Sequence, residues 1–293
     1  MLIIKSGSPC NIIKSWQAFL NSQGCDAGTA DGIWGAKATS ATKCFQTNAG
    51  ISVDGLVGPG TYQAAQDRGY VMPPIAVPEG NTNTMVDLSH YNGTVDLAKA
   101  KASGIQAVIN KATEGMEPKY NDSSYATNRA AAAAAGLLWG AYHFGENADG
   151  AAQADHFLSI AKPDTSTLLV LDYEWLSRGS ARNINIAQAV AFVNRILEVT
   201  GTRPGIYAGY GFKQDMYSAT PAQQAALQQC WIWPAAYACS VSIPAGWSAY
   251  TFWQYTSNGY ADGIGYCDRS YFKGTDDELA SFWAQNAAKT AVS

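Results

Sequence analysis

Two carboxylates, Asp172 and Glu174, stand at the end of the apolar run in LLVLDYEWL, residues 168–176. A short apolar run of this kind is typical of a strand buried on both faces, and such strands rarely end in paired acids. Side chains alternate along a strand, so residues i and i+2 share a face, with Cα atoms about 6.6 Å apart at roughly 3.3 Å of rise per residue. The two carboxyl groups could therefore act together on one substrate.

The chemistry that suits such a pair is the hydrolysis of a glycosidic bond. Like charges at this range raise the pKa of at least one carboxyl group, and desolvation beside Tyr173 and Trp175 would raise it further. One neutral acid beside one ionised acid is the arrangement that glycosidases use. The backbone separation falls between the side-chain separations of retaining and inverting enzymes, so both mechanisms stay open. For the pair alone, a simpler interpretation also stays open: two solvated or helix-capping acids.

The residues from 85 onward must position these acids. Along this part of the chain, strand-like and helix-like segments alternate. Helical periodicity and closing glycines predict helices over 95–104, 123–136, 150–161 and 186–201, each between strand-like runs. In the final third the helices shrink or vanish, except for a predicted helix after residue 275 that packs on the outside. About five βα units and then three strands predict an α/β fold, an irregular (β/α) barrel of about eight strands. A doubly wound open sheet is the alternative, because strand count alone cannot close a barrel.

A barrel of this kind places its site at the carboxyl ends of the strands, so the acids at those ends are the candidate catalytic residues. These are Asp87 at the first strand, Asp172 and Glu174 at the fourth, and Asp268 in the last. Aromatic side chains at strand ends could offer flat faces and hydroxyl groups to sugars. The candidates for substrate binding are Tyr142, Tyr207, Tyr237 and Trp253. Each alone could equally belong to the core, and we expect two of the four to touch substrate.

The N-terminal part contains an internal repeat. DGIWGAKATSA begins at Asp31, and DGLVGPGTYQA begins at Asp54, 23 residues later. Each copy starts with an Asp-Gly turn and continues into a helix-like segment, and an apolar helical pattern over 12–24 precedes the first copy. We predict a small all-helical domain of three helices over residues 1–69, a Pro- and Asn-rich linker over 70–84, and the barrel over 85–293.

Composition and charge exclude several classes of function. The net charge is −4, only 14% of the residues are charged, and no cluster of Lys and Arg is visible, so we expect no nucleic-acid partner. No run approaches the ~18 apolar residues of a membrane span, so we expect no stable membrane association. We expect a monomer. The apolar stretch before Lys5 is too short for a signal peptide, so we expect no export signal.

The histidines and cysteines do not form a recognisable site. The three histidines lack metal-ligand spacing, the six cysteines lack a C-x-x-C pair, and no glycine-rich stretch fits a nucleotide-binding motif. We therefore expect no metal and no cofactor. A chain of this size does not need disulfides to fold, so we expect mostly reduced, packed thiols.

The N-terminal residues resemble a known binding module. The segments WQAFLNSQG, DGIWGAKAT and FQTNAGISVDGLVGPGTY are similar to the peptidoglycan-binding domain 1 family, over roughly residues 10 to 68. This resemblance implies a three-helix module that binds the bacterial cell wall. The repeat by itself indicates only two similar turns.

The barrel residues resemble a family of enzymes. VDLSHYNG, VINKATEG, GLLWGAYHF, LLVLDYEW, GIYAGY, WIWPAAY and FWQYTSNG…GIGYCDRSYF resemble, in this order, glycoside hydrolase family 25. The resemblance implies hydrolysis of the β-1,4 bond between N-acetylmuramic acid and N-acetylglucosamine. It implies that Glu174 is the general acid and then base, and that Asp87 and Asp268 set the electrostatics and hold polar groups of the substrate. Asp172 is then either the nucleophile or the residue that orients the N-acetyl group of the substrate. We favour the orienting role, with net retention of the anomeric configuration. Pro234 departs from the family pattern.

Other functions remain open. A glucosaminidase, a lytic transglycosylase or an inactive wall-binding protein would share the aromatic groove and the N-terminal module. A wall hydrolase without an export signal resembles a phage endolysin. We therefore expect a protein made in the host cytoplasm that reaches the wall, in the periplasm, after the membrane is permeabilised.

Overall fold

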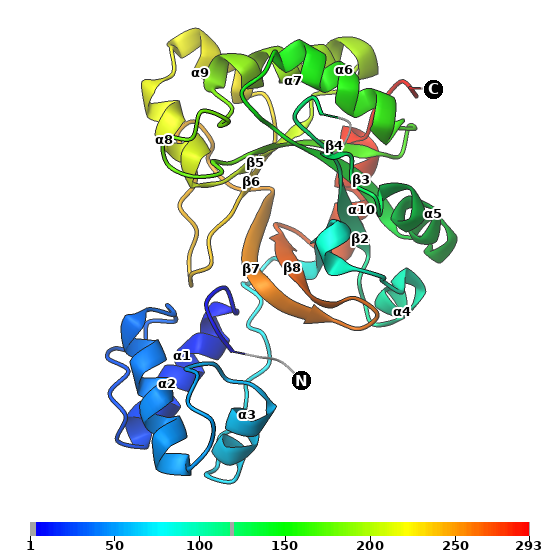
Figure 1. The fold of residues 1–293 in the computed structure, drawn as a ribbon. Coiled ribbons are helices and arrows are strands. Elements are labelled where there is room, and N and C mark those ends of the chain that lie inside the picture. Colours follow the sequence, from blue (N-terminus) through cyan, green and yellow to red (C-terminus); the bar gives the residue numbers. More distant parts are fainter. Residues whose placement is uncertain (1–3, 118–119, 293) are drawn as a thin grey trace.

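The structure is a computed structural model that describes residues 4–117 and 120–292. It consists of a small helical domain and a larger domain built around a sheet of eight strands (Figure 1). An extended segment without helix or strand, residues 71–78, connects the two. Within the described residues, no helix has both the length and the apolar character needed to cross a membrane.

The helical domain contains α1 (Cys10–Ser22), α2 (Ala36–Ala49) and α3 (Pro59–Gln66). Its core consists of the apolar faces of these helices, with Trp16 and Phe45 in edge-to-face contact at 5.8 Å between ring centroids. Three helices were predicted, and the family-like helical region is confirmed. The helices α2 and α3 begin at Ala36 and Pro59, shortly after the Asp-Gly turns of the two repeat copies.

The sequence repeat builds two equivalent turns, each held by a buried glutamine. Gln17 Nε2 donates to Asp31 Oδ1 at 2.9 Å, and its Oε1 accepts from the backbone N–H of Gly32 at 2.8 Å. Gln46 Nε2 donates to Asp54 Oδ1 at 2.7 Å, and its Oε1 accepts from the N–H of the glycine that follows, at 2.8 Å. Both glycines have φ near +80°, which a side chain would strain. The repeat therefore has a structural role, because it builds the two turns that the glutamines hold.

The sheet of the larger domain runs in the order β6-β5-β4-β3-β2-β1-β8-β7. Its strands are β1 (Thr82–Leu88), β2 (Ala107–Glu114), β3 (Leu138–Phe144), β4 (Leu168–Tyr173), β5 (Gly205–Ala208), β6 (Ile232–Pro234), β7 (Phe252–Ala261) and β8 (Gly265–Phe272). Strands β1 to β6 pair in parallel, and a bridge between Ala235 and Gln254 links the two edges. The barrel of eight strands is confirmed. A doubly wound sheet is excluded because the order never reverses along the chain.

One strand runs against the expectation of a parallel barrel. β8 is antiparallel to both of its neighbours, β1 and β7. The reason is the short turn between β7 and β8, which leaves no room for the crossover helix that a parallel pair needs. The predicted linker, residues 70–84, overlaps the first three residues of β1, and Pro234 is the last residue of β6, paired with Ala208.

Helices cover the outside of the barrel, as Figure 1 shows. They are α4 (Leu97–Ala102), α5 (Tyr125–Ala135), α6 (Gly150–Ala161), α7 (Ile186–Thr200), α8 (Tyr210–Ser218) and α9 (Pro221–Leu227), while a short helix η1 (His90–Asn92) follows β1 and α10 (Asp276–Asn286) follows β8. The last helix, α10, differs from its prediction. Its Leu279 and Trp283 are buried in the cluster that fills the barrel interior, together with Leu168 and Phe252 from the starts of their strands. α10 therefore closes the end of the barrel opposite the carboxyl ends of the parallel strands.

The cysteines differ from the expectation of reduced thiols. Cys25 and Cys44 form a disulfide within the helical domain, and Cys10 and Cys239 form one between the two domains. Cys230 and Cys267 are free and buried. The expectation considered the size of the whole chain, but a helical domain of some 60 residues has a small core of its own and gains most from a cross-link.

Further contacts join the domains beside the Cys10–Cys239 disulfide. The carbonyl oxygen of Gly7 accepts from the backbone N–H of Ser257 at 3.1 Å and from the hydroxyl of Thr256. Both donors lie where β7 departs from regular pairing with β8. The N-terminal segment therefore lies against an irregular edge of the barrel.

Candidate active site

The end of β4 presents Asp172 and Glu174 to one side and Tyr173 to the other, as the alternation rule predicts. Tyr173 is fully buried behind the sheet, and its hydroxyl donates to Asp215 Oδ2 at 2.7 Å. Trp175 donates its Nε1–H to the same oxygen at 3.0 Å. Asp215, on α8, thus fixes the residues on both sides of Glu174. Sequence analysis missed it, because nothing in the sequence links α8 to β4.

All four predicted acids line one cavity of about 150 Å³. The other lining residues are Tyr142, Tyr207, Trp233, Tyr237 and Gln254. The carboxyl ends of the parallel strands meet here, as expected for a barrel of this type. The structure therefore brings together the four acids and three of the four candidate aromatic residues.

Asp268 reaches the cavity by a different route from the one predicted. Because β8 runs antiparallel to β1, Asp268 lies in the middle of its strand, with its Cα directly opposite that of Asp87. Each carboxyl group shifts the pKa of the other, because Asp268 raises the pKa of Asp87 while Asp87 acts to lower that of Asp268. Two like charges this close repel each other, which favours a proton on one member of the pair.

Gln254 organises the polar side of the cavity. Its Nε2 donates to both carboxyl oxygens of Asp87 at 3.0 Å, and its Oε1 accepts from the hydroxyls of Tyr207 and Tyr237, each at 2.8 Å. Sequence analysis missed this residue and named its neighbour Trp253 instead. Strand alternation offered a signal, since a polar residue in the apolar run FWQY marks the face that meets a polar site.

Trp253 lies outside the cavity, which corrects the prediction. It packs with Tyr255 and Tyr271 on the outer face of β7 and donates its Nε1–H to the carbonyl of Ala236 at 2.9 Å. Phe252 and Gln254 face the barrel interior, so Trp253, between them, must face outward. Whether the three tyrosines touch substrate stays a prediction.

Burial raises the pKa values of all four acids, and the charge of a neighbouring acid raises those of Asp87, Asp172 and Glu174 further. Burial, and then the charge of Asp268, raise the pKa of Glu174 to about 6. Burial raises the pKa of Asp268 to about 6, while its interaction with Asp87 acts in the opposite direction. For Asp87 and Asp172 burial is again the main cause, followed by the charges of Asp268 and Glu174 respectively, and both pKa values lie well above the ordinary range. Glu174 can therefore carry a proton near pH 6.

Asp172 holds an unused acceptor. Its Oδ1 is buried and has no hydrogen-bond partner among the described residues. A buried carboxylate oxygen without a donor is costly, and native proteins leave such atoms where a ligand completes them. The atom belongs to a residue that lines the cavity, so a ligand in the cavity is the natural source of the missing donor.

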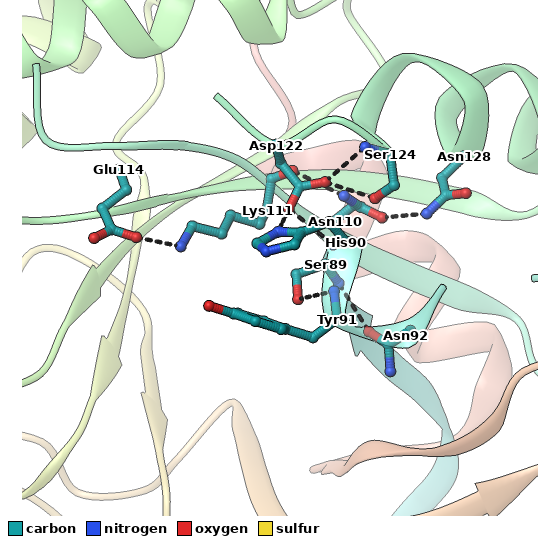
Figure 2. Close-up of polar contacts among 10 residues, drawn as sticks. All are labelled: Ser89, His90, Tyr91, Asn92, Asn110, Lys111, Glu114, Asp122, Ser124 and Asn128. Atoms are coloured by element: carbon teal, nitrogen blue, oxygen red, sulfur yellow. Dashed lines mark hydrogen bonds and ion pairs between the residues drawn. The ribbon is translucent and has the colours of Figure 1, made fainter. Parts of the chain in front are cut away.

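Lys111, on β2, is a cation whose charge acts on the pKa values of two of these acids. Its charge lowers the pKa values of Asp172 and Glu174, although burial outweighs it in both. Figure 2 shows Lys111 extending to Glu114, where Nζ and Oε2 are 2.6 Å apart. The same view shows His90 held by Asp122, with Nδ1 and Oδ2 2.8 Å apart. Sequence analysis did not select Lys111, since a lone lysine in a strand gives no signal.

No group of three or more His, Cys, Asp or Glu side chains in the described ranges is arranged to hold a metal ion. The polar groups that line the cavity are carboxyl groups, hydroxyls and one amide. An eight-stranded barrel with paired carboxyl groups at the end of β4, in a cavity lined by tyrosines, defines a glycoside hydrolase.

The family follows from the sequence comparison. The model of glycosyl hydrolases family 25 matches residues 86–264, and the chain belongs to this family. A second model, a putative peptidoglycan binding domain, matches residues 11–65. The protein is thus a glycoside hydrolase of the muramidase type, from a family that hydrolyses peptidoglycan, with a peptidoglycan-binding domain before the barrel.

Individual relatives agree with this assignment. Lysozyme M1 of Streptomyces globisporus is 31% identical over 215 residues, which cover 69% of this chain and 71% of the relative. The bacterial lysozyme of Streptomyces coelicolor is 29% identical with a TM-score of 0.61, covering 69% of this chain and 97% of that one. The muramidase of Trichobolus zukalii is 33% identical with a TM-score of 0.59, covering 68% and 98%.

Proposed function

We propose that this protein cleaves the β-1,4 bond between N-acetylmuramic acid and N-acetylglucosamine, with net retention and with the N-acetyl group of the substrate as internal nucleophile. The observation that carries the proposal is the buried Oδ1 atom of Asp172, which has no hydrogen-bond partner among the described residues. Glu174, whose pKa is raised, lines the same cavity. An acetamido N–H is a donor of the kind this atom lacks.

Glu174 acts first as the acid. With its pKa near 6, it holds a proton that it gives to the glycosidic oxygen as the bond to the anomeric carbon breaks. Asp172 accepts the acetamido N–H and fixes the group so that its carbonyl oxygen attacks the anomeric carbon. Positive charge develops on the acetamido nitrogen and favours the ionised form of Asp172, as the charge of Lys111 does.

Glu174 then acts as the base. Its carboxylate takes a proton from water as the water oxygen attacks the anomeric carbon and the acetamido oxygen leaves. Two displacements at the same carbon give net retention. The pair of Asp87 and Asp268 and the amide of Gln254 line the same cavity, where they can hold substrate hydroxyl and amide groups.

Mass spectrometry of digested peptidoglycan tests the bond that is cut. We expect fragments with muramic acid at the reducing end. Glucosamine at the reducing end would indicate a glucosaminidase, anhydro-muramic products a transglycosylase, and no release a binding protein, and each would overturn the proposal.

The role of Asp172 has its own test. We expect a thiazoline analogue of the cyclised N-acetyl intermediate to inhibit the enzyme, and NMR to show the β-anomer as the first product. A trapped covalent sugar on Asp172 would replace the assisted mechanism by a covalent one. Formation of the α-anomer would contradict retention altogether.

We further propose that the protein is a phage endolysin, made in the host cytoplasm, that cuts the wall in the periplasm after the membrane is permeabilised. The combination of a wall-binding domain and a muramidase barrel supports this role. Expression in host cells should cause lysis only when a membrane-permeabilising protein is made at the same time. Lysis without that protein would contradict the proposal.

We also propose that the protein works as a monomer without stable membrane association. Light scattering after size exclusion should give the mass of one chain, and sedimentation with lipid vesicles should leave the protein in the supernatant.

A further inference from the structure

A second hollow lies directly beyond Glu174. It has a volume of about 210 Å³ and is lined by Glu174, Trp175, Ser177, Arg178, Tyr210 and Gly211. Glu174 also lines the catalytic cavity, so the two hollows meet at the proposed acid. A glycan strand whose scissile oxygen lies at Glu174 must continue past this residue, and the second hollow is adjacent to that path.

The hollow has a fixed wall. Trp175 is held by its hydrogen bond to Asp215, and a Cβ atom at Gly211 would clash with its indole ring. A Cβ at Gly209 would lie 2.7 Å from Cβ of Glu174. The two glycines thus let the start of α8 approach the end of β4, and the approach places Tyr210 beside Trp175 with ring centroids 5.9 Å apart. Tyr210 is 66% exposed, so much of its surface is open to a ligand.

The positively charged residue that lines the hollow is Arg178. Arg178 is exposed and forms no hydrogen bond or ion pair within 4–117 and 120–292. Arg182, on the same loop, differs: it pairs with Glu114 at 3.2 Å and with Glu146. A solvated arginine on a surface loop is unremarkable alone. Arg178, however, lines a hollow that adjoins the acid and contains an open tyrosine, in a chain with few cations.

We propose that this hollow binds the part of the glycan on the far side of Glu174, and that Arg178 binds the carboxylate that a muramic acid unit of that part carries. The proposal rests on the muramidase function proposed above. Guanidinium groups match carboxylates with two parallel hydrogen bonds, and Tyr210 offers a flat surface for a sugar or peptide. Of the two wall sugars, only N-acetylmuramic acid supplies a carboxylate. This carboxylate belongs either to its lactyl group or to the peptide attached to that group. Arg178 is thus a specificity residue that distinguishes peptidoglycan from uncharged N-acetylated glycans.

The first experiment compares arginine variants of the full chain on soluble, peptide-bearing glycan strands. We expect Arg178→Gln to raise KM about five- to tenfold with kcat changed less than twofold, because it removes binding and not proton transfer. Arg178→Lys should recover part of the loss, since it keeps the charge but not the paired geometry. Arg203→Gln is the matched control: Arg203 precedes β5 at the opposite end of the barrel, away from the hollow, and donates a hydrogen bond to Asn194 at 3.3 Å. Equal KM values for Arg178→Gln and Arg203→Gln would overturn the proposal.

The second experiment identifies the carboxylate. An amidase removes the peptide and frees the lactyl carboxylate, which is an amide in the peptide-bearing strands. On the stripped strands, a retained KM effect of Arg178→Gln shows that Arg178 also binds the lactyl carboxylate, and a lost effect shows that it requires a peptide carboxylate. On strands whose carboxylates have been converted to amides, wild type and Arg178→Gln should have the same KM. A KM ratio that survives this conversion would overturn the proposal, because no carboxylate remains to be bound.

A binding measurement separates this inference from the function on which it rests. In a Glu174→Gln background, calorimetry with soluble peptide-bearing fragments should show weaker binding when Arg178→Gln is added, with a similar five- to tenfold change. If product analysis of the wild type refutes the muramidase but this change in Kd remains, the hollow binds a carboxylate for another reaction. If muramidase products form and the change in Kd is absent, the inference about Arg178 is wrong and the muramidase stands.

Discussion

The two turns of the helical domain and the catalytic cavity use the same contact, a glutamine amide that donates to an aspartate. Gln17 and Gln46 bind Asp31 and Asp54 in the turns, and Gln254 binds Asp87 in the cavity. The outcomes are opposite. In the turns, hydrogen bonds to side chain and backbone lower the pKa values of the acids. In the cavity, burial and a second carboxyl group raise the pKa of Asp87 despite the amide.

This difference shows that surroundings, and not the hydrogen bond, decide what an acid does. The turn acids lie at the surface, so their hydrogen-bond donors outweigh a small desolvation cost, and the acids stay ionised and structural. The cavity acids are buried close to one another, so the protein holds protons on them that can be transferred. The predictions below change one region and leave the other intact.

The largest effect should come from Glu174→Gln, which removes the transferable proton. We expect kcat on purified peptidoglycan to fall about 10²- to 10⁴-fold, the range for loss of a general acid, with the thermal unfolding temperature not lowered. Release of reducing ends gives the rate. Near-normal activity would show that the acid is assigned wrongly.

The next largest effect should come from Gln254→Leu, which leaves Asp87 and two tyrosine hydroxyls without their shared amide. We expect kcat/KM to fall roughly 10- to 100-fold, since the group acts as one network. Trp253→Phe is the matched control, because this neighbour faces away from the cavity, and it should change kcat/KM less than twofold. The opposite ranking of the two variants would mean that the outer face of β7 binds substrate.

A third change reaches the helical domain alone. Gln46→Leu should lower the stability of this domain by about 1–3 kcal/mol, because buried donors and acceptors of the second turn lose their partner. Scanning calorimetry of the full chain should show an earlier transition, and kcat on soluble glycan fragments should stay within twofold of wild type. A fall in kcat to the level of Gln254→Leu would mean that the two regions are coupled.

The smallest effect concerns pH. The folded-state pKa of Glu174, about 6, lies above its ordinary value of 4.5, so the native state binds more protons than the unfolded state between these values. Stability should therefore fall as pH rises from about 4.5 to 6, and the loss, roughly 1–2 kcal/mol for this residue, stays complete above that range. Glu174→Gln should be more stable than wild type at pH 8 and equal to it at pH 4. Equal denaturation midpoints at pH 8 would mean that Glu174 is not desolvated.

The turn acids should show the opposite sign. Their lowered pKa values mean that the unfolded state binds more protons near the ordinary value of 3.8, so their contribution is present above that value and lost below it. Asp54→Asn should therefore reduce stability at pH 7 and have no effect at pH 2. The comparison of this variant with Glu174→Gln separates the two kinds of acid in one titration.

Much of the barrel could be predicted because its signals are local. Alternation along β4 places Asp172 and Glu174 on one face, and the apolar runs and helical periods give eight strands with five βα units. The direction of β8 could not be predicted from strand count, so Asp268 was expected at a strand end and lies in the middle of one. On β7 the run FWQY is buried on both faces, so burial does not distinguish Trp253 from Gln254, and only the polar character of Gln254 marks the face that meets the site.

The residues that were missed act over long sequence distances. Asp215 holds Trp175 from 40 positions away, and Gln254 binds Asp87 from 167 positions away. The disulfide between Cys10 and Cys239 spans 229 positions. A single sequence gives no sign of such pairs, because nothing in the spacing of two residues tells which strands will become neighbours.

The position of β8 and α10 late in the chain has a consequence for the timing of synthesis. Asp87 is made before the five βα units are complete, but its partners Gln254 and Asp268 and the helix that closes the barrel, with Trp283, are made after them. A chain that is still on the ribosome, with only the first five βα units synthesised, lacks the helix α10 that closes the barrel. It also lacks Asp268, the acid opposite Asp87. A wall-degrading activity of this design cannot begin on an incomplete chain.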